Sequence, residues 1–277
     1  MSGSDHPVST TGSAPIARSN SPLDLGALTS ARVALDRTGS SITTRHALEF
    51  LLAHAQARDA VHAVLAIPSL LHALQRRNLT ALAVRSAAAN RTEYLRRPDL
   101  GRNLATNPGA PSFPASSDRV GYSRDARTAS PPPDPATLSI ILADGLSALA
   151  IERHALPLLD ALLPLLDNTW QLTPIVIAEQ ARVALGDQIG EALRADATIM
   201  LIGERPGLSS PDSLGAYITW SPRPGRTDAE RNCVSNIRTE GLDYASAARK
   251  ITWYITEGRR LGLTGVSLRG SDTALLP

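Results

Sequence analysis

LSIILADG, residues 138–145, is the stretch of sequence that decides the fold class. It is an apolar run of strand length that ends at Asp144 and Gly145. Helical spacing of apolar residues follows over residues 147–166. A buried strand that leads through a short polar turn into a long helix is typical of a βα unit in a parallel sheet.

The same alternation continues toward the C-terminus. Apolar runs at residues 174–179 and 197–202 flank a predicted helix at 187–194. Further strands are predicted at 214–220 and 233–237, and a closing helix at 244–261 begins after Asp243 and ends near Gly262. Strands that alternate with helices predict a Rossmann-like, three-layer α/β domain with a mostly parallel sheet over residues 137–277.

The residues before this domain differ in composition. Residues 1–23 are rich in Ser, Thr, Gly and Pro and predict a disordered tail. Residues 24–105 predict a mainly helical region, with a helix capped by Thr44, a second at 69–77 and a strand at 79–87. Residues 106–136 are rich in Pro, Ser and Ala without an apolar period, which predicts a linker or insertion between two folded parts.

Composition excludes several classes of protein. The 277 residues carry a formal net charge of +2, and the arginines are scattered rather than clustered, so no nucleic-acid partner is expected. No run of about 18 apolar residues predicts a membrane span, and residues 1–20 lack the apolar core of a signal peptide. The single cysteine excludes an internal disulfide and a Cys-rich zinc site, which fits a reducing cytoplasm.

Polar residues follow the predicted strands at their carboxyl ends. In open parallel sheets the ligand crevice lies at this edge. The sequence therefore predicts one crevice lined by Asp144, Val183, Glu204 and Cys233. Glu204 stands beside Arg-Pro-Gly at a predicted strand end, where an acidic side chain does not contribute to core packing, and this position favours contact with a ligand. Asp144 has a second reading, as a residue of the helix N-terminus near Ser147.

The familiar catalytic and phosphate-binding motifs are absent. The chain lacks G-x-G-x-x-G after its first predicted strand, a Walker A sequence and a G-x-S-x-G nucleophile elbow. Cys233 and His154 could in principle form a thiol–imidazole pair, but a lone cysteine is more often a small buried apolar residue. His54 and His62 could share a helix face, yet no acidic cluster accompanies them, so no metal site is expected.

Six further stretches carry a distinctive pattern: RDAVHA (58–63), YLRRPDLGR (94–102), DGLSALA (144–150), GDQIGEAL (186–193), GERPGLSSPDSLGAYITWSPRPGRTDAERNCVSNI (203–237) and RRLGLTGV (259–266). Together these motifs resemble the small, or light, subunit of ethanolamine ammonia-lyase. The likeness covers about residues 25–270 in the family's order, and the run at 203–237 is its most specific part. Residues 106–136 depart from the family, which passes this point more briefly.

The resemblance implies a subunit rather than a complete enzyme. The family acts with a large barrel-shaped subunit and adenosylcobalamin, and converts ethanolamine to acetaldehyde and ammonia by a radical mechanism. By motif match, the cobalamin contacts fall on Val183, Glu204 and Cys233, and this chain contributes no catalytic residue. The resemblance also implies a hetero-oligomer of several large–small pairs in the cytoplasm, with residence in a bacterial microcompartment as a family expectation.

Two functions of different class follow from these observations. The first is a cobalamin-binding subunit of an ammonia-lyase. The second is a non-catalytic interaction or scaffold protein with a Rossmann-like fold and a partner surface built from loops. The residues without the resemblance leave these alternatives level, and retention of a corrinoid in the presence of a large subunit distinguishes them.

Overall fold

The computed structural model describes residues 37–38, 41–106 and 135–268. The chain forms two compact units, residues 1–46 and 47–277. In the first unit, β1 (Arg37–Thr38) and β2 (Ser41–Ile42) pair antiparallel. The predicted tail lies outside the described residues, as does most of the predicted linker, so the division of the chain into these segments stays a prediction.

Helix α2 (Thr44–His62) forms where the apolar spacing predicts a helix. The residue before Thr44 takes the capping position, because the Thr43 hydroxyl oxygen accepts from the His46 backbone N–H at 3.5 Å. Leu48, Leu51 and Leu52 are 60%, 59% and 61% exposed. The apolar spacing of this helix therefore does not mark a face that is buried within the chain.

A seven-stranded sheet forms the centre of the second unit, in the order β3-β6-β4-β7-β8-β9, with β5 paired to the start of β4. The pairs among β3, β4, β5, β6 and β7 are parallel, whereas β8 and β9 add to the edge antiparallel. This arrangement confirms the mostly parallel α/β prediction. The strands are β3 (Ala81–Arg85), β4 (Ala136–Ala143), β5 (Trp170–Leu172), β6 (Ile175–Glu179), β7 (Ala197–Gly203), β8 (Leu214–Trp220) and β9 (Asn232–Ile237).

Strand β3 comes from the segment predicted to be mainly helical, yet it pairs in register with β6 of the central sheet. Helix α3 begins at Ile67, two residues before the predicted start, since Pro68 fits a first turn in which its missing N–H has no partner to lose. The described helical segments besides α2 are α3 (Ile67–Gln75), α4 (Arg91–Arg96), η1 (Leu100–Arg102), α5 (Ala148–Ala150), η2 (Ile151–Ala155), α6 (Leu156–Leu162), η3 (Leu163–Leu165), α7 (Leu185–Ala192), η4 (Asp228–Glu230) and α8 (Tyr244–Leu261).

Helix α8 has the ends that the sequence predicts. The Asp243 carboxylate accepts from the Ser246 backbone N–H at 2.9 Å and so caps the first turn. Gly262 ends the helix with a φ of 70°, a left-handed conformation that glycine adopts without a steric penalty.

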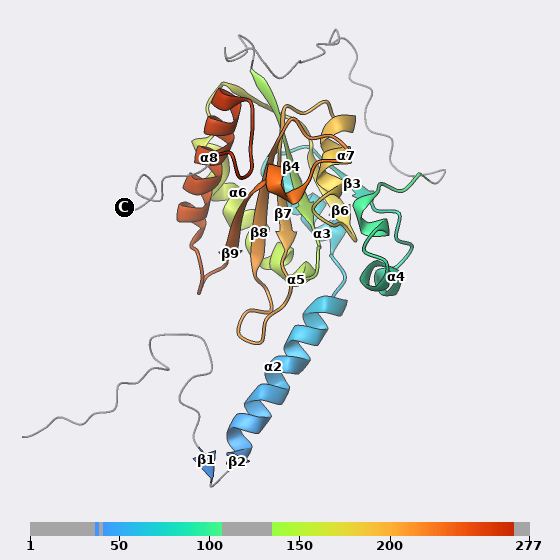
Figure 1. Cartoon of the computed structure of the whole chain (residues 1–277), viewed down its shortest axis with the longest axis vertical. Coiled ribbons are helices and arrows are strands. Elements are labelled where there is room, and N and C mark those ends of the chain that lie inside the picture. The colour runs from blue at the N-terminus through green and yellow to red at the C-terminus, as the bar shows by residue number, and fades with distance from the viewer. Residues whose placement is uncertain (1–36, 39–40, 107–134, 269–277) are drawn as a thin grey trace, which may run out of the picture. The chain divides into compact units, whose positions relative to one another are not determined.

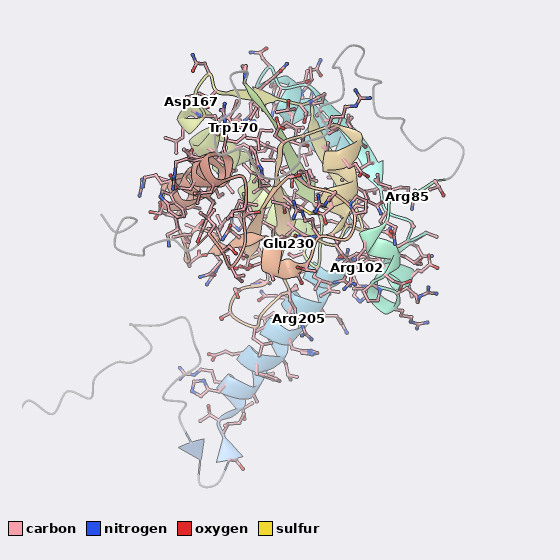
Figure 2. The ribbon with its side chains drawn as sticks, turned by 45° about the horizontal axis from the view of Figure 1, so that its top comes forward. Arg85, Arg102, Asp167, Trp170, Arg205 and Glu230 are labelled. Atoms are coloured by element: carbon pink, nitrogen blue, oxygen red, sulfur yellow. The ribbon has the colours of Figure 1, made fainter. Side chains whose placement is uncertain are left out.

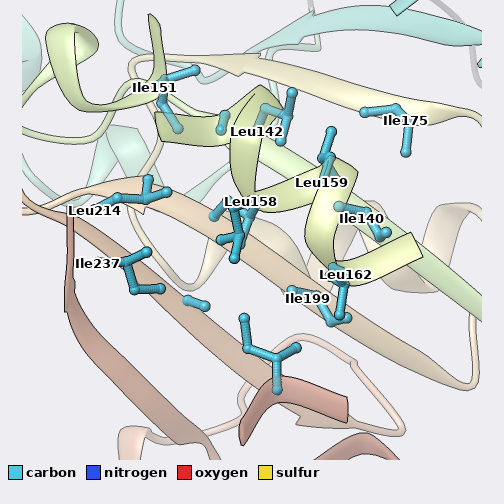
Figure 3. Packing of buried hydrophobic residues seen from close by; sticks show 14 of the residues in the cluster. Ile140, Leu142, Ile151, Leu158, Leu159, Leu162, Ile175, Ile199, Leu214 and Ile237 are labelled. Atoms are coloured by element: carbon cyan, nitrogen blue, oxygen red, sulfur yellow. The ribbon is translucent and has the colours of Figure 1, made fainter. Parts of the chain in front are cut away.

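The sheet separates two apolar cores, as strand alternation requires. We call face A the side that carries Ile140 and Leu142, and face B the side that carries Ile141 and Ala143. Helices α6 and α8 pack on face A, and α7 packs on face B (Figure 1). Figure 3 shows the leucines of α6 against the strands on face A. Full burial of one such leucine contributes about 2 kcal/mol to stability.

Two glycines bring the turn after β4 against the end of β7. The Leu146 backbone N–H donates to the Gly203 carbonyl at 2.9 Å. Gly145 has a φ of 53°, and a Cβ on Gly203 would lie 2.0 Å from the Ser147 carbonyl oxygen. This contact requires glycine on both sides, and it fixes where the chain leaves β7 toward Glu204. Figure 2 shows Arg205 beyond this end of the sheet, and Trp170 at the opposite end.

Candidate functional site

Face B is less covered over β8 and β9 than over the parallel strands. Residues 215 and 217 of β8 and residues 233 and 235 of β9 point to this face, because their neighbours Ala216 and Val234 belong to the face A core. Tyr217 is half-buried, and both β9 side chains on this face, Cys233 and Ser235, are exposed. The antiparallel edge therefore presents a partly open surface beside a closed core.

Glu204 lies at the border of this surface, just beyond the carboxyl end of β7. It follows Ile202 by two residues, which places it on face B at the end of β7. Its Oε2 atom accepts from the Ser213 hydroxyl and from the Asn236 backbone N–H, the second at 3.3 Å. No other described residue donates to the carboxylate, so Oε1 retains its capacity to accept a hydrogen bond from a ligand.

Gly215 and Asn236 give the Glu204 side chain its place. A Cβ on Gly215 would lie 2.9 Å from Oε1, so the carboxylate lies over a strand position that lacks a side chain. Asn236 has a φ of 59°, a conformation that asparagine tolerates better than most residues, and the register of β8 and β9 shifts at this end. The irregular end of β9 thereby turns the Asn236 N–H toward the carboxylate.

Cys233 lies on face B beside Tyr217, its partner in the β8–β9 register. Its sulfur is 3.2 Å from the Ser235 hydroxyl oxygen. Although the Cys233 residue as a whole is exposed, partial burial by the protein atoms around its thiol raises the pKa of that thiol. Burial together with the neighbouring Cys233 and Glu204 raises the pKa of the Tyr217 phenol. Both groups are therefore neutral near pH 7, and they offer polarizable surface and hydrogen bonds rather than a nucleophile.

Val183 lies in the loop between β6 and α7 and packs against the same face B core as Tyr217. Val183, Glu204 and Cys233, which the sequence predicts as cofactor contacts, therefore all lie on or against face B. Glu204 lies at a strand end as the strand-order argument expects, whereas Cys233 pairs with Tyr217, which in turn pairs with Met200 well inside β7. The candidate surface consequently runs from Glu204, at the carboxyl edge of the sheet, along face B to Cys233.

Asp144 does not line this surface, which corrects the sequence prediction. It is 4% exposed, and it accepts from Arg91 and from the Ala181 backbone N–H, each at 3.2 Å. Ser147, rather than Asp144, caps the following helix through the Ala150 N–H. Burial, only partly offset by Arg91, raises the pKa of Asp144 to about 6. Its task is to join the β4 turn to α4 and to the loop after β6.

Cys233 and His154 cannot pair, because they lie on opposite faces of the sheet. His154 belongs to the helix packed on face A, where its Nδ1 atom is 2.9 Å from the Tyr244 hydroxyl. No group of three or more metal-ligating side chains occurs among the described residues. None of the helices in that part of the chain is long and apolar enough to cross a bilayer.

Sequence reasoning missed Tyr217, Ser213 and Asn236. Tyr217 had a usable signal, since it stands two residues after Gly215 in a predicted strand and therefore on the same face. Ser213 and Asn236 had none, because their role depends on the pairing of β7 with β8 and on the irregular end of β9.

Comparison with known proteins gives a consistent family. The sequence model of the ethanolamine ammonia-lyase light chain (EutC) matches residues 20–269. The ethanolamine ammonia-lyase small subunit of Bradyrhizobium diazoefficiens is 51% identical over 257 residues, which cover 92% of each chain. The small subunits of Pseudomonas aeruginosa PAO1 and Azotobacter vinelandii are 48% and 51% identical, over 92% and 87% of this chain and 89% and 85% of their own lengths.

Proposed function

The chain belongs to the ethanolamine ammonia-lyase light-chain family, and from this premise we propose that it helps to bind adenosylcobalamin at an interface with a large catalytic subunit. Val183, Glu204 and Cys233 are the proposed contacts. The observation that carries the proposal is the Glu204 carboxylate, which is held by Ser213 and Asn236 through Oε2 and leaves Oε1 without a donor among the described residues.

The side chains on face B fit the chemistry of a corrinoid. A corrin ring has an apolar face and amide-bearing side arms. Val183 and the neutral thiol of Cys233 offer apolar surface, and Glu204 offers an acceptor for a side-arm amide. The exposed hydroxyl of Ser235 adds a group that can donate or accept.

The division of work between the subunits follows from these residues. When bound, adenosylcobalamin supplies the radical chemistry, and the protein supplies binding, orientation and exclusion of water. Neither the Cys233 thiol nor the Tyr217 phenol on face B is activated as a nucleophile or a base near pH 7, since both have raised pKa values. We therefore propose that this chain contributes no catalytic residue and that ammonia-lyase activity requires the large subunit.

No histidine of this chain is proposed as a cobalt ligand. His154, the histidine that is buried beside the central sheet, packs on face A and contacts Tyr244 and Asp212. Magnetic resonance spectra of the complex with nitrogen-15 histidine only in this subunit should show no coupling to the metal centre. Coupling to an imidazole of this chain would contradict the assignment.

Co-purification with the large subunit in the presence of cobalamin tests the proposal. The complex should retain the corrin absorption bands. Glu204→Gln should weaken retention by about tenfold, as expected for loss of a hydrogen bond to a charged group. Glu191→Gln, an exposed change on α7, is the matched control and should retain the cofactor like the unchanged chain.

The alternative function is a scaffold that binds a partner through its loops without a cofactor. It predicts the same co-purification with no corrin absorption contributed by this chain, and equal retention in Glu204→Gln and Glu191→Gln. Stoichiometry and residence in a microcompartment remain proposals from the family. A fluorescent fusion of residues 1–36 would test whether that segment directs the chain to such a compartment.

A further inference from the structure

The loop 204–213 joins β7 to β8 and has contacts on both faces of the sheet. At its start, Glu204 lies on face B, and its backbone N–H donates to the Ser213 carbonyl at 2.9 Å. At its end, Ser213 donates its hydroxyl back to the Glu204 carboxylate. The tip closes through the Gly207 N–H, which donates to the Ser210 carbonyl at 3.0 Å. The position of Glu204 therefore depends on where Ser213 is held.

Asp212 holds this end of the loop from face A. It is 8% exposed, and its Oδ2 atom accepts from Arg153 at 2.8 Å. The same oxygen lies 3.2 Å from His154 Nε2, although the N–H is not aligned for a strong hydrogen bond. Burial raises the pKa of Asp212, but Arg153 and His154 outweigh it and hold this pKa below its usual value, so the carboxylate is charged near pH 7.

His154 passes the contact on to a second element. The imidazole is 4% exposed, and its Nδ1 atom lies 2.9 Å from the hydroxyl of Tyr244, the first residue of α8. His154 belongs to a five-residue π-helix, Ile151–Ala155, a distortion that often occurs where a helix serves function. Asp212, His154 and Tyr244 thus connect the loop to two helices on face A.

We infer that Asp212, with His154 and Tyr244 behind it, positions the Glu204 carboxylate for its ligand on the opposite face of the sheet. This inference rests on the proposed function, because it concerns the residue that is proposed to bind the corrinoid. The contacts run from Tyr244 to His154, to Asp212, along one peptide to Ser213, and from the Ser213 hydroxyl to Glu204. None of the first three residues touches face B, so they act as positioning residues.

The test measures binding of cyanocobalamin, which does not turn over, to the complex with the large subunit. Asp212→Asn and Tyr244→Phe keep shape and remove a charge and a hydroxyl, and each is combined with Glu204→Gln. In the unchanged background Asp212→Asn should raise the dissociation constant about fivefold, and in the Glu204→Gln background less than about twofold. Glu191→Gln is the control, because that side chain is exposed on α7, and it should leave the dissociation constant unchanged.

Each outcome decides one of two questions. An equal effect of Asp212→Asn in both backgrounds, or no effect in the unchanged one, overturns the positioning role while leaving the proposed function in place. If Glu204→Gln itself leaves the dissociation constant unchanged, both the cofactor contact and the positioning role are wrong. If Asp212→Asn does not assemble, Tyr244→Phe decides by the same comparison, with an expected change of about twofold to threefold.

Discussion

The carboxylate of Asp187 pairs with the guanidinium of Arg231, and the two side chains are 3% and 2% exposed. Arg231 also donates to the carbonyls of Thr227 and Arg226. Asp187 lies on α7, four residues after Val183 in the preceding loop, and Arg231 precedes Cys233 by two residues. This buried pair therefore fixes the segments that carry two of the three proposed cofactor contacts.

Removal of one member of this pair should destabilise the chain strongly. Asp187→Asn leaves a buried cation without its partner, which costs about 3–5 kcal/mol of unfolding free energy. Urea denaturation of the full chain measures the change. The exposed pair Arg77–Asp160 gives the control, since Asp160→Asn should cost about 0–1 kcal/mol. A loss for Asp187→Asn no larger than for the control would show that the pair has no structural weight.

Gly215→Ala should weaken cofactor retention without unfolding the chain. The new Cβ would lie 2.9 Å from Glu204 Oε1, and the flexible carboxylate would give way rather than the backbone. We expect corrinoid affinity in the complex to fall by about tenfold, like that of Glu204→Gln. Gly258→Ala on α8 is the control. Its new Cβ would lie 3.1 Å from the Thr264 side chain, away from Glu204, and it should leave affinity unchanged.

Acidification from pH 7 to 5 should stabilise the fold through Asp144. Burial, only partly offset by Arg91, raises the pKa of this carboxyl to about 6, above the value of about 3.9 in an unfolded chain. A raised carboxyl pKa contributes stability that is present below the unfolded pKa and is lost as the pH rises through the folded pKa.

Asp144→Asn should flatten this dependence. Each linked proton contributes a slope of up to about 1.4 kcal/mol per pH unit between pH 4 and 6. Urea denaturation at pH 5, 6 and 7 should show a smaller rise in unfolding free energy on acidification for the variant than for the unchanged chain. Parallel pH curves for the two chains would mean that Asp144 has an ordinary pKa.

Cys233 should react slowly with alkylating agents. Its pKa is raised by partial burial, so the thiolate is scarcer at pH 7 than in a free cysteine. We expect iodoacetamide to label it more slowly than free cysteine at pH 7, and the rate to rise with pH. Addition of the large subunit and cobalamin should slow labelling further, if both cover face B. Cys233→Ser gives the background, since the chain has no second cysteine.

The proposed site could be predicted only in part, for a reason visible in Asp144 and Glu204. Both are acidic residues at the ends of predicted strands, and the sequence predicts the same crevice for both. Asp144 is buried, and its carboxylate is bound by Arg91 and the Ala181 N–H. Gly215, by contrast, leaves room for the Glu204 carboxylate at the edge of face B. The difference lies in residues far away along the chain, which local pattern does not report. Strand order also predicted Val183 and Cys233 beside this crevice, and the resemblance of motifs gave them their expected role as cofactor contacts.

The sequence by itself determined the local elements. Strand β8 has the predicted bounds, and α8 has its predicted cap and stop, because apolar periodicity, side-chain caps and glycine conformations act over a few residues. Only the tertiary structure decided that β3 joins the central sheet, that β8 and β9 run antiparallel, and that Glu204 and Cys233 share face B while His154 lies on the other. Those outcomes depend on pairings between distant segments, whose free energy comes from burial and hydrogen bonds that exist only once the chain is folded.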